Sequence, residues 1–348
     1  MRNRRHAWLI IGVLGAVLVG SVLLAVALGA VRVEPLAILE MGLNKLGLSQ
    51  FQPFWRPADE TIVMQIRLPR VIGAALVGSA LGTAGVLFQG LLRNPMADPY
   101  IIGTSAGAAL GAAVAMMVPL SVKFYGFGLV PIVAFLGALG AVAAVYNLAR
   151  VAGKTPVISM LLAGFAVSAL LMAIMSFLIF MGGELETRLH QVFAFLLGGI
   201  AVTHWEQLAV ISPILLGAIV FARLFAFRLN AFALGEEGAA YLGLNVERDK
   251  VLILSSGSLL TACAVSLSGL IGFVGLVVPH AVRLVLGPDH RLLLPVSGVV
   301  GAAFLVLADL AARTVLAPTE LPVGVLTALI GAPFFIYLLR RTRGQYAF

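Results

Sequence analysis

Residues 228–250 read RLNAFALGEEGAAYLGLNVERDK and form the longest polar interruption in the second half of a chain that is otherwise nearly all apolar. Apolar residues such as Leu234 and Ala239 alternate here with Glu236, Glu237 and a closing run of four charged residues. This spacing predicts a short amphipathic helix with polar flanks. We expect the segment to lie at the end of a membrane bundle and to contact a motor subunit.

The composition around this stretch is that of a membrane protein. Of the 348 residues, 61% are hydrophobic and 11% are charged, and the mean hydropathy is +1.07. Because a soluble domain needs more polar residues to cover its surface, the composition excludes one. The single cysteine, Cys263, excludes a disulfide within the chain. The net charge of +8 is better explained by basic loops on the inner side of a membrane than by nucleic-acid binding.

Apolar runs of about 20 residues recur along the whole chain, as helices crossing a bilayer core of about 30 Å require. The sequence therefore predicts an all-α polytopic membrane protein, one transmembrane domain over 1–348, with ten spans. We place them at 8–31, 71–92, 100–118, 129–149, 157–181, 206–227, 251–268, 269–287, 292–312 and 321–339. The eighth is rich in glycine and contains Pro279, so it is expected to be a broken helix with an extended first half.

An even number of spans places both termini on one side of the membrane. With the termini inside, 15 of the 23 Lys and Arg residues are assigned to inner segments, which favours cytoplasmic termini. The first apolar run is too long for the core of a cleaved signal peptide and is taken as an uncleaved span.

A weak internal repeat relates the two halves, roughly 67–181 and 250–340. A shift of 184 residues aligns Leu76, Ala80, Gly85, Leu92, Pro95, Ala97 and Gly103 with identical residues of the second half, seven identities in 28 positions. The expected topology runs the two copies in opposite directions, and inverted repeats with matching breaks are typical of transporters.

Two motifs of enzymes occur, and neither is in a suitable context. The sequence GTSAG at 103–107 resembles a nucleophile motif, but no strand precedes it, and its glycines at spacing four favour helix packing. The sequence AGKT at 152–155 resembles the end of a phosphate-binding loop, but Leu148 stands where the first glycine belongs. The five histidines have no metal-ligand spacing. We expect no catalytic residue and no metal site.

Charged residues near span ends leave two interpretations open. Arg67, Arg70 and Arg313 fall at the outer side, where arginines either extend to the membrane interface or bind carboxylates with their forked guanidinium groups. Asp309 and Glu206 are the candidate proton-relay carboxylates of a secondary transporter, although Asp309 lies one helical turn from Arg313 and an ion pair is the simpler interpretation.

Several segments together resemble one family. They are RLPR (67–70), QGLLRNPMADPYIIG (89–103), LLAG (161–164), LNAFALGEEGAAYLG (229–243), SGLIGFVGLVVPHAVRLVLGPDHR (268–291) and ELPVGVLTALIGAPFFIYLL (320–339). In this order they resemble the permease of bacterial ABC importers for iron-siderophores, haem and cobalamin. The resemblance implies a homodimer or a pair of different permeases, two cytoplasmic ATPase subunits that bind ATP and Mg, and a periplasmic or lipid-anchored binding protein.

The resemblance also implies roles for particular residues, which divide into four groups. Arg67, Arg70 and Arg313 match the arginines that receive carboxylates of the binding protein, so docking becomes the favoured interpretation. Leu234, Gly235, Glu236, Glu237 and Ala240 fall in the coupling segment that contacts the ATPases. Asn94 and Met96 occupy inner-gate positions, where the family often has Leu in place of Met96. Pro279, His280 and Arg283 match the broken helix, whose role is left open.

The sequence therefore predicts an importer permease of the cytoplasmic membrane that works by alternating access and binds no cofactor of its own. A proton-coupled secondary transporter is the alternative. No motif indicates the substrate class. An iron-siderophore is favoured over haem or cobalamin only because siderophore importers are the broadest group in the family.

Overall fold

The structure of the protein is a computed structural model in which residues 4–29, 33–45, 47–48, 51, 54–120, 122–181 and 185–341 are described. Regular structure within these residues is helical, apart from two isolated β-bridges. In chain order the elements are α1 (Arg4–Ala27), α2 (Pro35–Lys45), α3 (Pro57–Thr61), η1 (Ile62–Arg67), α4 (Leu68–Leu91), α5 (Thr104–Met117), α6 (Leu129–Ala149), α7 (Val157–Met181), α8 (Leu185–Leu197), α9 (Trp205–Ala222), η2 (Arg223–Phe225), α10 (Ala226–Phe232), α11 (Glu236–Tyr241), α12 (Val246–Ser268), α13 (Val274–Leu286), α14 (His290–Thr314) and α15 (Val323–Arg341).

Seven helical stretches in the described part of the chain are long and apolar enough to cross a membrane. They are Leu9–Ala27, Pro57–Leu91, Leu129–Ala149, Val157–Met181, Trp205–Phe232, Val246–Ser268 and His290–Thr314, and three shorter apolar helices, Thr104–Met117, Val274–Leu286 and Val323–Leu338, accompany them. The prediction of an all-α polytopic membrane protein is confirmed.

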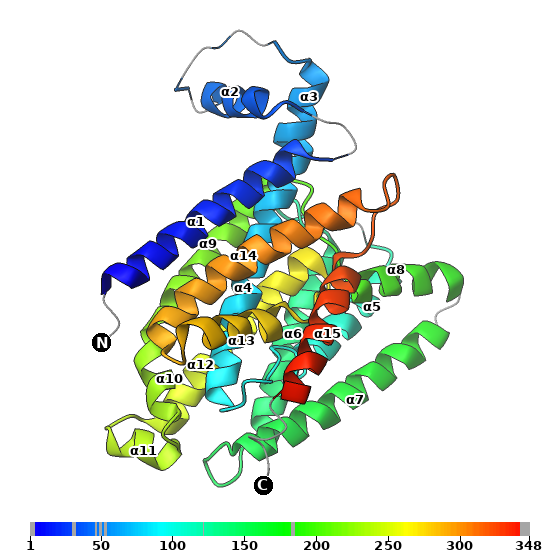
Figure 1. Cartoon of the computed structure of the whole chain (residues 1–348). Coiled ribbons are helices and arrows are strands. Elements are labelled where there is room, and N and C mark those ends of the chain that lie inside the picture. The colour runs from blue at the N-terminus through cyan, green and yellow to red at the C-terminus, as the bar shows by residue number, and fades with distance from the viewer. Residues whose placement is uncertain are drawn as a thin grey trace.

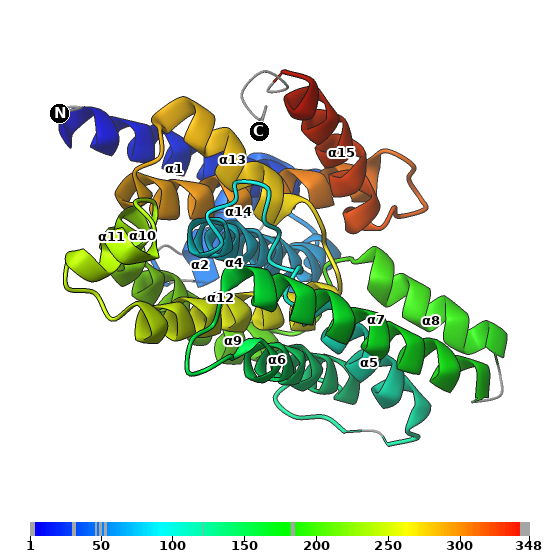
Figure 2. The same ribbon diagram turned by 90° about the horizontal axis from the view of Figure 1, so that it is seen from below.

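The centre of the bundle is formed by α4, α12 and α14 (Figures 1 and 2), which bury most of their residues. By contrast, α1 and α7 expose most of their apolar side chains, as helices that face lipid do. Small residues explain the close packing in the middle: a Cβ added at Gly78 of α4 would overlap the carbonyl oxygen of Gly301 in α14. Such glycine contacts let two backbones approach in lipid, where van der Waals packing drives association.

The second predicted span begins earlier than expected. Helix α3, the π-helical turn η1 and α4 follow one another without a break from Pro57 to Leu91. Pro57 stands in the first turn of α3, where the missing N–H costs nothing, whereas Pro69 lies inside the continuous helix, just after the π-helical turn η1. The helix therefore extends well beyond the predicted start of this span at residue 71.

The stretch at 228–250 contains one short helix, α11, between the end of α10 and the start of α12. Helix α10 ends before Gly235, whose φ of +96° interrupts the helical backbone, and the six-residue α11 follows. Helix α12 then begins after Asn245, whose side chain accepts a hydrogen bond from the backbone N–H of Arg248 at 3.1 Å. Glycine at +96° carries no Cβ strain, which is why the turn falls there.

The eighth span has a non-helical part followed by a helix, and the break is not at Pro279. Residues 270–272 have no regular secondary structure, and Gly269 and Phe273 on either side have positive φ angles of 62° and 68°. Pro279 lies inside α13. An interior proline leaves the carbonyl four residues earlier without its helical donor, and here Gln89 Nε2 donates to that carbonyl, Gly275 O, at 3.4 Å.

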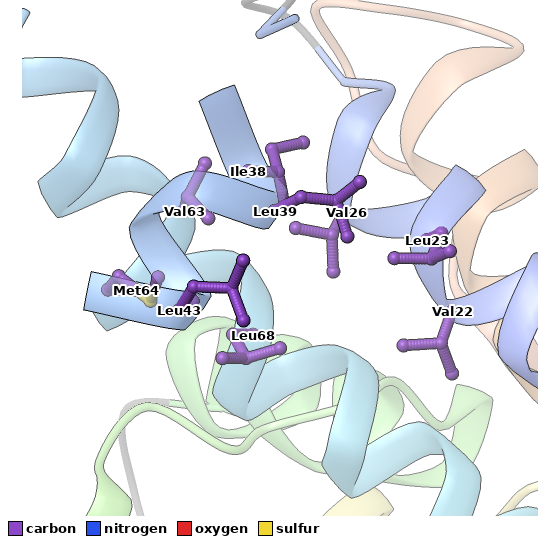
Figure 3. Close-up of a pocket in the computed structure, with 10 residues that line it drawn as sticks. Val22, Leu23, Val26, Ile38, Leu39, Leu43, Val63, Met64 and Leu68 are labelled. Atoms are coloured by element: carbon purple, nitrogen blue, oxygen red, sulfur yellow. The ribbon is translucent and has the colours of Figure 1, made fainter. Parts of the chain in front are cut away.

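The two ends of the bundle carry different short helices. Helices α2 and α3 lie at one end and α11 at the opposite end (Figure 1). Between α1, α2, η1 and the start of α4 is a pocket of about 270 Å³ lined only by apolar residues, among them Val22, Leu39 and Met64 (Figure 3). Because its lining offers no hydrogen-bonding side chain, this pocket has nothing to hold a polar substrate.

Candidate functional site

Two of the three predicted docking arginines lie in one charge cluster at the α2 end of the bundle. Arg70 Nε lies 3.0 Å from Asp309 Oδ1, and Arg70 Nη1 lies 2.9 Å from Glu320 Oε2. Arg313 Nε lies 2.9 Å from Asp309 Oδ2. The side chain of Asp309 is 1% exposed, so one buried carboxylate is shared by two guanidinium groups from α4 and α14.

The same region fixes the end of α1. Arg67 Nη1 donates to the carbonyl oxygens of Val26 at 2.9 Å and Ala27 at 3.2 Å, and Arg313 Nη2 donates to Ala25 O at 3.2 Å. Carbonyls in the last turn of a helix lack helical donors, and arginine side chains satisfy them. Sequence reasoning missed this role, because nothing near residue 67 shows that α1 ends beside it.

The three arginines differ in how far they reach solvent. Arg67 is 6% exposed, the Arg313 side chain is 8% exposed and the Arg70 side chain is 20% exposed. Arg70 is therefore the most accessible of the three, and its partner Glu320, with a side chain that is 52% exposed, lies outermost in the cluster.

The carboxylates proposed for proton relay do not lie free inside the membrane. Asp309 is held by the two arginines described above. Glu206 lies in the first turn of α9 and is exposed. The alternative of a proton-coupled transporter therefore loses both residues on which it rested.

The two residues predicted for the inner gate, Asn94 and Met96, lie in the connection between α4 and α5. Asn94 Oδ1 accepts from the backbone N–H of Met96 at 2.9 Å, which shapes the turn around Pro95. The next polar residue, Asp98, likewise accepts from the N–H of Tyr100 at 2.8 Å, and Tyr100 Oη donates to Ile271 O at 3.2 Å. This loop is thus bound to the non-helical segment that precedes α13.

Helix α13 is joined to the last turn of α4 by hydrogen bonds of two polar side chains. Arg283 Nη1 donates to Gln89 Oε1 at 2.8 Å, and Gln89 Nε2 donates to Leu276 O at 3.1 Å. Of the three residues predicted for the broken helix, Arg283 is the one with a side-chain partner in α4. Sequence reasoning missed Gln89, although an amide inside an apolar span was a usable signal.

The predicted coupling segment is exposed at the opposite end of the molecule. Leu234 is 70% exposed and Tyr241 is 91% exposed. Glu237 and Ala240 are exposed on α11, and Glu236 forms a salt bridge to Lys250 of α12. Large apolar side chains this exposed next to charged ones are typical of a protein contact surface.

Neither of the two enzyme-like motifs lies in a catalytic setting. Ser105 is in the first turn of α5, without the strand that a nucleophile motif requires. Residues 151–154 form a tight turn closed by backbone hydrogen bonds between Val151 and Lys154. Among the described residues no group of three or more His, Cys, Asp or Glu side chains could hold a metal ion.

Known proteins resemble this chain over most of its length. The hemin transport system permease protein of Yersinia pestis is 38% identical over 324 residues, 89% of this chain and 94% of that protein. The cobalamin import system permease protein of Halobacterium salinarum is 47% identical over 281 residues, 81% of this chain and 74% of that protein. A solved structure of a metal-chelate type ABC transporter in an inward-facing conformation superposes with a TM-score of 0.80 at 31% identity, covering 95% of this chain and 99% of that one. The FecCD transport family matches residues 17–341, and this chain is a member of that family.

Proposed function

We propose that this chain is the permease of an ATP-binding-cassette importer that moves an iron-siderophore, haem or cobalamin-type substrate into the cytoplasm. The observation that carries the proposal is the match of the FecCD family to residues 17–341, together with relatives named for haem and cobalamin import. The chain is a transport subunit of a multi-pass membrane protein family, and ATP hydrolysis in these systems belongs to a separate subunit.

The proposed topology has ten crossings, seven by the long helices and three by the shorter apolar ones. Both termini then lie in the cytoplasm, residues 1–348 form a single membrane domain, and the halves 67–181 and 250–340 are related as an inverted repeat. The antiparallel course of α4 and α12 at the centre of the bundle supports this arrangement (Figure 1).

The two ends of the bundle are assigned to different partners, according to the side chains at each end. Arg67, Arg70 and Arg313 form the outer docking site for carboxylates of a substrate-binding protein. Leu234, Gly235, Glu236, Glu237 and Ala240 contact one of two cytoplasmic ATPases, which hold ATP and Mg. A second permease copy completes a homodimer around the pathway, and this chain binds no cofactor itself.

The mechanism is alternating access driven by these partners. ATP binding closes the ATPase pair, the coupling segment moves, and the mouths of the pathway open in turn. Asn94 and Met96 close the inner mouth, where a flexible methionine fills gaps well. Pro279, His280 and Arg283 belong to α13, which the Arg283–Gln89 hydrogen bond joins to the α4 end of that gate.

Purification of a tagged copy from its native membranes in mild detergent tests the proposal. An ATPase present in equal amount, with a binding protein recovered after crosslinking, is the expected result, and the metal content or colour of the bound ligand identifies the substrate class. A crosslinked preparation with no ATPase would rule out the importer and reopen the proton-coupled alternative, which would then need a titratable group other than Asp309 and Glu206.

Replacement of Arg70 by Ala is expected to weaken docking of the co-purifying binding protein. A hydrogen bond to a charged group contributes about 1.5–3 kcal/mol, so Kd should rise on the order of ten- to a hundredfold. The measurement is surface-plasmon binding to permease in nanodiscs. Arg56→Ala is the matched control, because the Arg56 side chain is 75% exposed near the same end and forms a local salt bridge to Asp59, three residues further along the chain. Equal loss for both variants would reject Arg70 as a specific docking contact.

A further inference from the structure

Lys250, in the first turns of α12, is a buried cation whose hydrogen-bonding capacity is fully used. It is 3% exposed. Its Nζ lies 2.7 Å from Glu236 Oε2, 3.0 Å from Glu247 Oε1 and 3.1 Å from the carbonyl oxygen of Thr155. An ammonium group has three N–H donors and no acceptor, so each donor has its own partner.

The three acceptors belong to three different segments. Glu236 begins α11, Glu247 is in α12, and Thr155 lies two residues before α7. Glu247 Oε2 in turn accepts from the Thr155 N–H at 3.0 Å and from Thr155 Oγ1 at 2.6 Å. The network is therefore closed, and the threonine of the AGKT motif is a structural part of it.

Helix α11 has little else to hold it to the bundle. Ala239 is its one buried residue, and the adjoining Leu234 and Tyr241 are largely exposed. In the described part of the chain, the only salt bridge of α11 is the one between Glu236 and Lys250. A displacement of α11 thus reaches the rest of the molecule mainly through Lys250 and the short connections of the chain.

We infer that Lys250 is a positioning residue that passes movement of α11 to α12 and to the start of α7. The inference rests on the proposed function, in which α11 contacts an ATPase. Helix α12 lies at the centre of the bundle beside α4 (Figure 2), and the gate loop follows the end of α4. Removal of the ammonium would leave Glu236 and Glu247 facing each other without a counter-charge, which disfavours the present position of α11.

The test uses the permease purified with its ATPase and a reporter at the gate. Met96→Cys is labelled with a maleimide, with and without ATP and vanadate, and Cys263 contributes little background because it is completely buried. The Met96→Cys permease without further substitutions, which is the parent, is expected to change its labelling rate when ATP is trapped by vanadate. Lys250→Met should still bind the ATPase and allow ATP hydrolysis. The ATP-dependent change in its labelling rate should be smaller by a factor on the order of ten. Lys250→Arg should restore part of it.

Controls separate coupling from folding. Arg248→Met removes an exposed cation two residues away and should respond as the parent does. Thr155→Val removes one hydrogen bond of the network and no charge. It takes the place of Lys250→Met in the test if the Lys250→Met complex does not assemble. It should lose part of the ATP-dependent change in labelling rate. A full ATP response in an assembled Lys250→Met or Thr155→Val complex overturns the inference. No ATP response in the parent, or no bound ATPase, overturns the proposed function instead.

Discussion

Gly85→Leu is expected to prevent recovery of folded protein. Gly85 lies in the last third of α4, and a Cβ at this position would overlap the carbonyl oxygen of Gly275 at the start of α13. A backbone atom cannot rotate away as a side chain can, so α4 and α13 would have to separate. We expect a cost of about 3 kcal/mol or more, at the upper end of the range for overpacking.

Size-exclusion chromatography of the detergent extract and a thermal melt measure this loss. Gly217→Leu is the control, because Gly217 lies in α9 with nothing within 4 Å of an added Cβ. It should elute and melt as the wild type does. If Gly85→Leu were recovered with an unchanged melting temperature, α4 and α13 could not be as close as the structure places them.

Much of the fold follows from composition and helical length. The long apolar runs were sufficient to predict an all-α polytopic membrane protein, because a helix in lipid must satisfy its own backbone and so must be long and apolar. The short helices were harder to place. The break in the eighth span falls at Gly269–Phe273 and not at Pro279, because Gln89 from α4 compensates the carbonyl that the proline leaves free, and that contact is invisible in sequence.

The sequence pointed to single residues of the candidate sites, but not to the hydrogen bonds and salt bridges that connect them. The RLPR motif identifies Arg67 and Arg70, yet only the structure shows that Arg67 caps α1 while Arg70 pairs with Asp309 and Glu320. The AGKT motif was rejected as a nucleotide site without revealing that Thr155 joins Lys250. Both networks connect residues far apart in the chain, and a single sequence carries no signal for such pairings.

Asp309→Leu is expected to be the most destabilising substitution in the outer cluster. The carboxylate accepts from Arg70 at 3.0 Å and Arg313 at 2.9 Å, and within the described part of the chain Arg313 forms no salt bridge to a second carboxylate. Loss of one partner of a buried ion pair costs about 3–5 kcal/mol, because the remaining charge stays buried without compensation. Denaturant titration and thermal unfolding in detergent measure the change.

A second substitution decides whether the cost comes from the uncompensated charge. The double variant Asp309→Leu with Arg313→Met removes the buried cation together with its partner, and most of the lost stability should return, because replacing both members of a buried pair by apolar residues is often neutral. Glu320→Gln is the exposed control and should cost less than about 1 kcal/mol. If the double variant were no more stable than Asp309→Leu alone, the carboxylate would act through packing or its contact with Arg70. Recovery would instead identify Asp309 as the counter-ion that lets two arginines lie together at this end of the bundle.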